Sequence, residues 1–164
     1  MIVKYPNKIL RTRLDEVSDF SSPNLKSVIK QMTSDMIKYD GIGIAANQVG
    51  INKKIIIINT ENGPREFINA KIVKKSLIKS KSDEGCLSFP GISGRAKRYK
   101  TITVEYQTFN GEKKNICVSG LYSFVFQHEI DHTNGIIFTD RLYKFTEGKK
   151  LFKELQKKAK LDEK

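Results

Sequence analysis

The two histidines of the chain lie four residues apart, in the segment QHEIDH at positions 127–132. Positions i and i+4 of an α-helix project from the same face, so a helix here would let His128 and His132 bind one metal ion. Glu129, beside the first histidine, could then take a proton from water at the metal. This H-E-x-x-H pattern is typical of metal-dependent hydrolases, although a helical surface with two solvated histidines has the same spacing.

Length and composition indicate one globular domain. The chain has 164 residues, of which 29% are charged and 38% are hydrophobic, as in ordinary soluble proteins. The longest apolar run, Ile55 to Ile58, is too short to cross a bilayer, and the segment MIVKYP at the N-terminus lacks the pattern of a signal peptide. We therefore expect a cytoplasmic monomer with no membrane partner, in which Cys86 and Cys117 stay reduced rather than forming a disulfide.

The net charge of +12 predicts attraction to polyanions such as RNA. The sequence contains no nucleic-acid-binding motif, so the charge indicates only that an anionic partner is close. Seven lysines crowd the C-terminal segment, where Leu151, Phe152 and Leu155 could anchor one helix face; they are Lys144, Lys149, Lys150, Lys153, Lys157, Lys158 and Lys160.

The order of the expected elements predicts an α+β fold. Ser22-Pro23 is typical of a helix start, and that helix should end near Tyr39. A glycine-bearing loop at 41–50 follows. Thr146 could cap a final helix, and Glu147 would lie in its first turn. Strands are expected at 54–59, 67–68, 72–79, 101–106 and 115–119, and a helix from Leu121 to Gly135 carries the histidines.

These elements predict a mainly antiparallel sheet around a central metal-binding helix, with an N-terminal and a C-terminal helix. We divide the chain into a catalytic domain at 1–145 and a basic helix at 146–164 that packs on it.

A catalytic metal needs a third protein ligand. The metzincin pattern is excluded because it requires histidine at position 138, which is Phe138. Cys86 is the strongest candidate, since it follows Gly85 in a loop after a strand and a thiolate binds zinc or ferrous iron well. Cys117 lies within an apolar strand, where cysteine usually acts as a small hydrophobic residue. Glu147 would suit a thermolysin-like site, but we assign it to the helix start.

The segment GIGIAANQ at 41–48 is a third candidate constellation. It is not a dinucleotide fingerprint, because no strand precedes it. Its glycines would let a peptide backbone lie alongside, and the Gln48 amide could donate a hydrogen bond to an oxyanion. A simple turn between a helix and a strand is the alternative interpretation.

Three motifs in order, GIGIAANQ at 41–48, EGCLS at 84–88 and QHEIDH at 127–132, resemble those of the peptide deformylase family. The similarity runs from Tyr5-Pro6 to Asp140-Arg141. The resemblance implies an enzyme that removes formyl from the N-terminal formyl-methionine of new polypeptides. It implies Fe²⁺ as the metal, with Zn²⁺, Ni²⁺ or Co²⁺ able to substitute.

The resemblance also implies a role for each site residue. Cys86, His128 and His132 would bind the metal, and Glu129 would act as general base and then as proton donor. The Gln48 side chain and the Leu87 backbone N–H would hold the oxyanion. The substrate backbone would lie along Ile42, Gly43, Ile44 and Gly85, and the methionine pocket would be walled by Leu121, Phe124, Val125 and His128. Plain core packing is the alternative for the three apolar wall residues.

We further predict that Arg98 pairs with Asp131 and so supports the metal helix; two solvated charges are the alternative. The chain departs from the usual family pattern at Asn69-Ala70, Tyr122-Ser123 and Thr133, none of which is a ligand or catalytic position.

Two other functions stay open at this point: a general H-E-x-x-H metallopeptidase, and a basic RNA- or ribosome-binding module with a structural zinc. The basic C-terminal helix could dock an enzyme on the ribosome.

Overall fold

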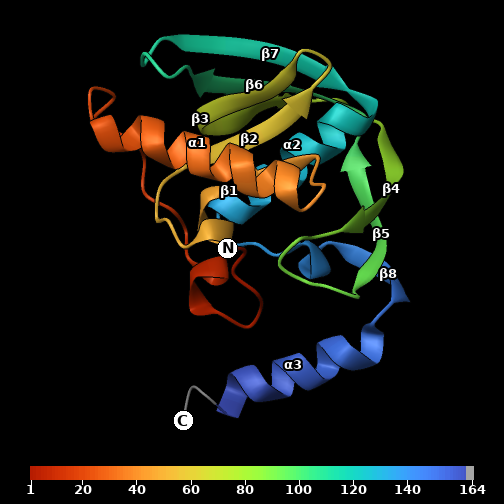
Figure 1. Cartoon of the computed structure of the whole chain (residues 1–164). Helices are drawn as coiled ribbons and strands as arrows, with labels where there is room; N and C mark the ends of the chain where they lie inside the picture. Colours follow the sequence, from red (N-terminus) through yellow and green to blue (C-terminus); the bar gives the residue numbers. More distant parts are fainter. Residues whose placement is uncertain (162–164) are drawn as a thin grey trace.

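The computed structural model describes residues 1–161 and has the predicted α+β architecture (Figure 1). The α-helices are α1 (Pro23–Lys38), α2 (Gly120–Thr133) and α3 (Lys149–Leu161). The strands are β1 (Gly43–Ala45), β2 (Ile55–Thr60), β3 (Gly63–Lys75), β4 (Lys79–Gly85), β5 (Ser93–Tyr99), β6 (Thr101–Gln107), β7 (Lys113–Ser119) and β8 (Leu142–Glu147).

The strands form two antiparallel sheets. One has five strands in the order β1-β2-β3-β6-β7, and the other has three in the order β4-β5-β8. Every pairing of neighbouring strands in them is antiparallel, as predicted. The strands β1 and β4 each lie at one edge of their sheet, and this leaves an edge of each available to an extended peptide.

The run Ile55 to Ile58 is buried on both sides because helices cover both faces of the larger sheet. Ile57 belongs to the apolar cluster that contains Met32 of α1. Ile58 belongs to the opposite cluster, which contains Phe126 of α2. Side chains alternate between the two faces of a strand, so a continuous apolar run is expected where both faces are covered. Figure 1 shows α2 running through the middle of the molecule, as predicted for the histidine-bearing helix.

Helix α1 begins at Pro23, as the sequence predicts, although the Ser22 side chain makes no capping hydrogen bond. Its buried face carries Leu25, Met32, Met36 and the carboxyl group of Asp35. Asp35 is not left unpaired, because it accepts hydrogen bonds from the Met1 amine at 3.0 Å and from Gln31 Nε2 at 2.8 Å.

The prediction that Thr146 and Glu147 begin the last helix is wrong. Both residues lie in β8, which pairs with β5, and α3 begins only at Lys149. Gly148, with φ of +68°, turns the chain between them. Sheet pairing, which depends on a strand distant in sequence, takes precedence here over the local capping signal.

Helix α3 packs through only part of its expected apolar face. Phe152 is buried and lies against Phe89 and Tyr5, with ring centroids 6.4 and 5.8 Å away. Leu155 is partly buried in the same cluster, whereas Leu151 is 41% exposed, so its assignment to the inner face is wrong. Residues 162–164 of the predicted basic segment lie outside the described residues.

Three smaller predictions also need correction. The segment at 41–50 is not only a loop, because it contains β1 and a short 3₁₀ helix at Ala46–Val49. The separate strands expected at 67–68 and 72–79 are one long strand, β3, and Lys79 already belongs to β4. Cys117 is exposed on β7 rather than buried, because none of the described segments packs on it there.

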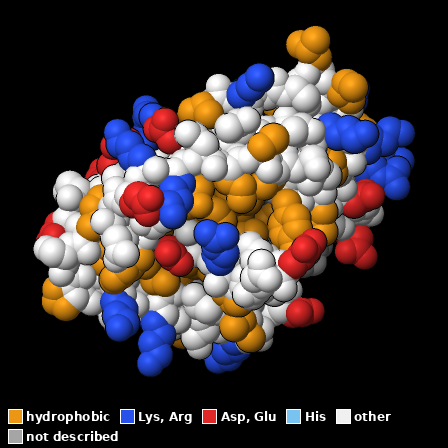
Figure 2. Space-filling view, turned by 90° about the horizontal axis from the view of Figure 1, so that it is seen from above, with side chains coloured by type: hydrophobic (Ala, Val, Ile, Leu, Met, Phe, Trp, Pro, Cys, Tyr) orange, Lys and Arg blue, Asp and Glu red, His pale blue; other side chains and the backbone are white. Residues whose placement is uncertain are grey.

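The surface carries many cationic side chains. Figure 2 shows apolar side chains gathered toward the middle of one face, with Lys and Arg side chains projecting around its periphery. Among the described helices, none has both the length and the apolar character needed to cross a membrane.

Candidate active site

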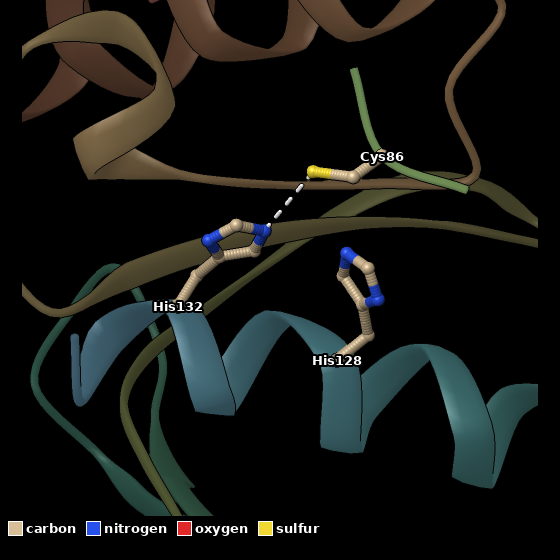
Figure 3. A group of neighbouring side chains, drawn as sticks. All are labelled: Cys86, His128 and His132. Carbon is tan, nitrogen blue, oxygen red and sulfur yellow. Dashed lines mark hydrogen bonds between the residues drawn. The ribbon is translucent and has the colours of Figure 1, made fainter. Parts of the chain in front are cut away.

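Helix α2 and the segment after β4 bring Cys86, His128 and His132 together, here called the Cys/His/His cluster (Figure 3). One side-chain atom of each residue lies within 4.8 Å of the others. Cys86 Sγ is 3.3 Å from His132 Nε2, and both imidazole rings project from α2 toward the cysteine. The i, i+4 spacing therefore places both rings on one helix face, as the sequence predicts.

This cluster fits a transition-metal ion. Ordinary Zn–N and Zn–S bond lengths in a tetrahedral site place nitrogen and sulfur ligands about 3.6 Å apart, close to the 3.3 Å between His132 Nε2 and Cys86 Sγ. Two imidazoles and a thiolate suit zinc or ferrous iron better than the oxygen-preferring Mg²⁺ or Ca²⁺. The cluster also has the three protein ligands of a catalytic rather than a structural site.

A buried ion-pair network contacts the Nδ1 atom of His128. Glu84 Oε2 accepts a hydrogen bond from His128 Nδ1 at 3.1 Å, and both carboxylate oxygens of Glu84 accept from Arg98 at 2.7 and 2.9 Å. Arg98 also donates to Asp131 on α2, the contact predicted from the sequence, and Asp131 accepts a further pair of hydrogen bonds from Arg141. The network joins β4, β5 and α2, so it fixes the orientation of the His128 ring.

The network also sets the charge state around the cluster. Burial alone would raise the pKa of Glu84, but hydrogen bonds and charges from Arg98 and His128 hold its pKa at about 2. Burial alone would lower the pKa of His128, whereas its contacts with Cys86 and Glu84 and the charge of Glu129 raise that pKa well above the ordinary value. Anionic groups that favour a proton on His128 also favour a divalent cation at the same place.

Glu129 projects from α2 into a buried position beside the cluster. Its side chain is 5% exposed, and its Oε2 atom has no hydrogen-bond partner among the described residues. Burial raises the pKa of Glu129 to about 7. A carboxyl group with this pKa can both accept and release a proton near neutral pH, which is what a general base that later becomes an acid requires.

Gly43 of β1 leaves room for the Glu129 carboxyl group. A Cβ atom on Gly43 would lie 2.7 Å from Glu129 Oε1 and 2.9 Å from its Cγ. Even a methyl side chain on β1 would therefore push the carboxyl group out of place.

If Glu129 is the general base that the sequence predicts, Gly43→Ala should lower the kcat/KM of hydrolysis by roughly 100-fold, since displacing a catalytic group by about 1 Å has an effect of that size. Bound metal should be retained, because Gly43 does not touch the Cys/His/His cluster. Metal analysis and steady-state kinetics on the same sample measure both. Wild-type kinetics for this variant would show that the position of Glu129 is unimportant.

Gln48 lies between β1 and the cluster. Its Oε1 accepts a hydrogen bond from the Ala45 backbone N–H at 2.8 Å, so its Nε2 faces the other way. That nitrogen donates to Cys86 Sγ at 3.4 Å and to Ser88 Oγ at 3.2 Å. The Gln48 amide is thus held in one orientation, in which its Nε2 atom faces Cys86 of the cluster and Ser88 beside it.

A cavity of about 430 Å³ opens over the cluster. Its apolar wall includes Leu121, Phe124 and Val125 of α2, which argues against core packing as their only role. Ile42, which precedes β1, and Gly43 of β1 line it on one side, and Ser82 to Gly85 line it from the edge of β4. Ile44 does not line it, because its side chain is fully buried in the α1 side of the core.

Two residues of the site have contacts that sequence reasoning missed. From the sequence, Glu84 and Ser88 are predicted only to belong to the motif EGCLS, and neither has a role of its own. Metal-binding histidines usually donate their second ring N–H to a carboxylate, so an acid two residues before Cys86 could have been named as that partner. Nothing in the sequence alone indicates the contact of Ser88 with Gln48.

The chain matches the family model for polypeptide deformylase over residues 1–147. It is 40% identical over 138 residues to the peptide deformylase of Thermotoga maritima, with 84% of each chain covered. Its fold matches the crystal structure of the peptide deformylase from Thermotoga maritima with a TM-score of 0.84 at 39% identity. The match covers 87% of this chain and 96% of the other.

The peptide deformylase of Plasmodium falciparum, solved in complex with an inhibitor, is also similar. It matches with a TM-score of 0.83 at 42% identity, over 98% of this chain and 97% of that one. The residues that the family model matches include the segments that carry the cluster, Glu129 and Gln48. The chain therefore belongs to the polypeptide deformylase family.

Proposed function

We propose that this protein hydrolyses the formyl amide at the N-terminus of newly synthesised polypeptides, using a metal held by Cys86, His128 and His132. The products are formate and a free methionyl amino terminus. The observation that carries the proposal is the position of the Cys/His/His cluster and Glu129 together at an apolar cavity, in a chain of the deformylase family.

A bound divalent cation would supply Lewis-acid chemistry, polarising the formyl carbonyl and making water a better nucleophile. Glu129 takes the proton from that water and later delivers it to the leaving amine. As the carbonyl oxygen gains negative charge, Gln48 Nε2 and the Leu87 backbone N–H donate hydrogen bonds to it. Gln48 needs no reorientation for this, because Ala45 and Ser88 already fix its amide.

The substrate backbone lies between the two sheet edges that line the cavity. Gly43 and Ile44 of β1, with Ile42 directly before them, present the free edge of the larger sheet, and Gly85 ends the edge strand β4 on the other side. An extended peptide can add to an exposed sheet edge by main-chain hydrogen bonds, independently of its sequence. This suits an enzyme whose substrates share only their first residue.

The methionine side chain enters the apolar part of the cavity against Leu121, Phe124 and Val125. An unbranched thioether fits an irregular apolar pocket well. Arg98 and Asp131 do not touch the substrate in this scheme. They position α2 and, through Glu84, the His128 ring. All of these residues lie in the segment 1–145 that we assign to the catalytic domain.

We assign Fe²⁺ as the physiological metal, with Zn²⁺, Ni²⁺ or Co²⁺ able to replace it. One thiolate and two imidazoles form a donor set that all four ions accept. A thiolate beside ferrous iron is also open to oxidation, and this gives the metal assignment a measurable consequence.

We expect the iron form to lose activity in air faster than the nickel and cobalt forms do. Oxidation at the metal and at Cys86 causes the loss, so catalase and a reductant should slow it. The measurement follows residual activity of each metal form over time in air and under argon. Equal decay of the iron and nickel forms in air would contradict the assignment.

The function itself is tested by offering matched substrates. We expect formyl-Met-Ala to release formate in step with free amine, and acetyl-Met-Ala and unblocked peptides to be cleaved far more slowly. Cleavage of internal peptide bonds at comparable rates would support a general metallopeptidase. Metal binding without turnover of any of these substrates would support a structural zinc module.

For the partner, we propose that the basic C-terminal segment contacts the ribosome while the enzyme acts as a cytoplasmic monomer. The described lysines of α3 are exposed, whereas Phe152 attaches the helix to the domain. Figure 1 shows α3 at the end of the molecule away from β6 and β7. Ribosomal RNA offers the phosphates that such a lysine face would contact.

Replacing Lys150, Lys153 and Lys157 with glutamine should weaken ribosome co-sedimentation and reduce its salt dependence, while activity on formyl-Met-Ala stays unchanged. Truncation is a poorer test, because it removes the buried Phe152. The matched control replaces Lys26, Lys30 and Lys38 of α1 with glutamine. If the α3 variant and the α1 variant bind the ribosome with equal affinity, α3 does not contact the ribosome and has only a structural role.

A further inference from the structure

The turn between β3 and β4 presents two large aliphatic side chains to solvent. Leu77 is 101% exposed and Ile78 is 63% exposed, and we call this pair the apolar tip. Turns are usually built from Gly, Pro, Asn, Asp or Ser. Isolated exposed apolar residues are common on proteins, whereas Leu77 and Ile78 are adjacent at one turn and together present a small contiguous apolar surface to solvent.

The apolar tip is held rigidly. The Ser76 backbone N–H donates to the Thr101 carbonyl at 2.9 Å, and the Lys100 N–H donates to the Ile78 carbonyl at 2.9 Å. Ser76 Oγ adds hydrogen bonds to the Ile78 carbonyl and from the Thr101 N–H, at 2.9 and 3.2 Å. The turn is therefore tied to the β5–β6 turn, and its exposed side chains need no further backbone ordering on binding.

Cationic side chains surround the apolar tip. Four exposed lysines lie next to it in the chain or in the adjoining turn, and we call them the tip lysines: Lys74, Lys75, Lys79 and Lys100. In the part of the chain that the structure describes, none of these four makes an ion pair, whereas nearby Lys71 is paired with Glu105 at 2.7 Å. The charge around the tip is thus uncompensated.

Two tip lysines converge on one aromatic ring. Lys75 Nζ lies 5.2 Å and Lys79 Nζ lies 4.6 Å from the centre of the Tyr99 ring. Both ammonium groups therefore lie near one ring, which concentrates positive charge beside the apolar tip. Lipid phosphates are anions that such a concentration of charge attracts.

We propose, in place of the expectation from the sequence that the protein has no membrane partner, that the apolar tip and the tip lysines dock this protein on the surface of an anionic phospholipid bilayer. Leu77 and Ile78 enter the boundary between headgroups and acyl chains, and the lysines contact lipid phosphates. Amphipathic elements that lie on membranes combine apolar insertion with attraction to anionic lipids in this way. RNA would also attract the lysines, but it offers no apolar layer for the two aliphatic side chains.

Docking at the tip leaves the cavity free. Strand β4 starts beside the tip at Lys79, and the part of it that lines the cavity runs from Ser82 to Gly85. The stretch from Lys79 to Ser82 spans roughly 10 Å. A peptide could therefore enter the cavity while the tip contacts a bilayer.

The test measures co-sedimentation of the full chain with vesicles of phosphatidylcholine alone or mixed equally with phosphatidylglycerol. We expect binding only to the mixed vesicles, and loss of binding at high salt. Leu77→Ser combined with Ile78→Ser should lower the apparent affinity about tenfold or more, because the inserted apolar surface is lost. Lys75→Gln combined with Lys79→Gln should lower it by a similar factor.

Matched controls distinguish the tip from surface charge in general. Ile37→Ser removes an aliphatic side chain that is 60% exposed on α1, and Lys26→Gln with Lys30→Gln removes two exposed lysines there; both should bind like the wild type. Activity on formyl-Met-Ala should be unchanged in every variant, which shows that each is folded. Equal vesicle binding by the tip variant and the wild type would overturn the proposal. So would retention of poly(U) RNA together with no binding to mixed vesicles.

Discussion

Replacing Glu129 with glutamine is expected to leave the metal bound and to lower kcat by a factor of about 10²–10⁴, the usual contribution of a general base. Glutamine has the same shape as glutamate but cannot accept the proton from water. Glu129 is not one of the three residues of the Cys/His/His cluster, so the metal ligands stay intact. Metal analysis and kcat on formyl-Met-Ala measure the two expectations on one preparation.

Glu129→Asp is the matched comparison for this variant. It keeps a carboxylate but withdraws it from the cavity by one methylene, so its activity should fall between those of the wild type and Glu129→Gln. A kcat for Glu129→Gln within threefold of the wild type, with full metal content, would remove Glu129 from the mechanism.

Cys86→Ser should weaken metal binding by more than about 100-fold, since even the loss of a group behind a metal ligand costs 10–100-fold in affinity. Activity should fall in parallel at limiting metal. The cause is the loss of the thiolate that lies 3.3 Å from His132 Nε2. Competition with a chromogenic chelator measures the affinity of each variant for Zn²⁺ or Co²⁺.

Cys117→Ser is the matched control, because Cys117 is exposed on β7 and touches none of the cluster. Its metal affinity, activity and Tm should equal those of the wild type. In the metal-loaded protein, an alkylating reagent should modify Cys117 and spare Cys86. Equal modification of both thiols would mean that Cys86 is not a ligand.

Much of the site could be predicted because its signals are local. The spacing of His128 and His132 suits a helix, because a helix brings residues four apart to one side. The apolar run of β2 and the period of α1 likewise reflect short-range order, and both elements form where expected. The motif EGCLS identified the cysteine, since a glycine-flanked thiol in a loop has few structural roles.

The errors arise where a partner distant in sequence decides the structure. Thr146 has the chemistry of a helix cap, but its segment pairs with β5 and forms the strand β8. Cys117 lies in an apolar stretch, yet within residues 1–161 no layer covers it on β7, so it is exposed. Glu84 gains its role only when β4, β5 and α2 meet, which places Arg98 and His128 on either side of it. None of these contacts follows from residue spacing.

The central claim is that one metal ion at the Cys/His/His cluster makes this chain a deformylase. The most direct measurement titrates Fe²⁺ or Co²⁺ anaerobically into chelator-stripped protein and records formate release from formyl-Met-Ala at each addition. The account predicts activity that rises from zero in proportion to bound metal and reaches a plateau at one ion per chain. Undiminished formate release by the stripped protein, or saturation with metal without any formate release, would contradict it.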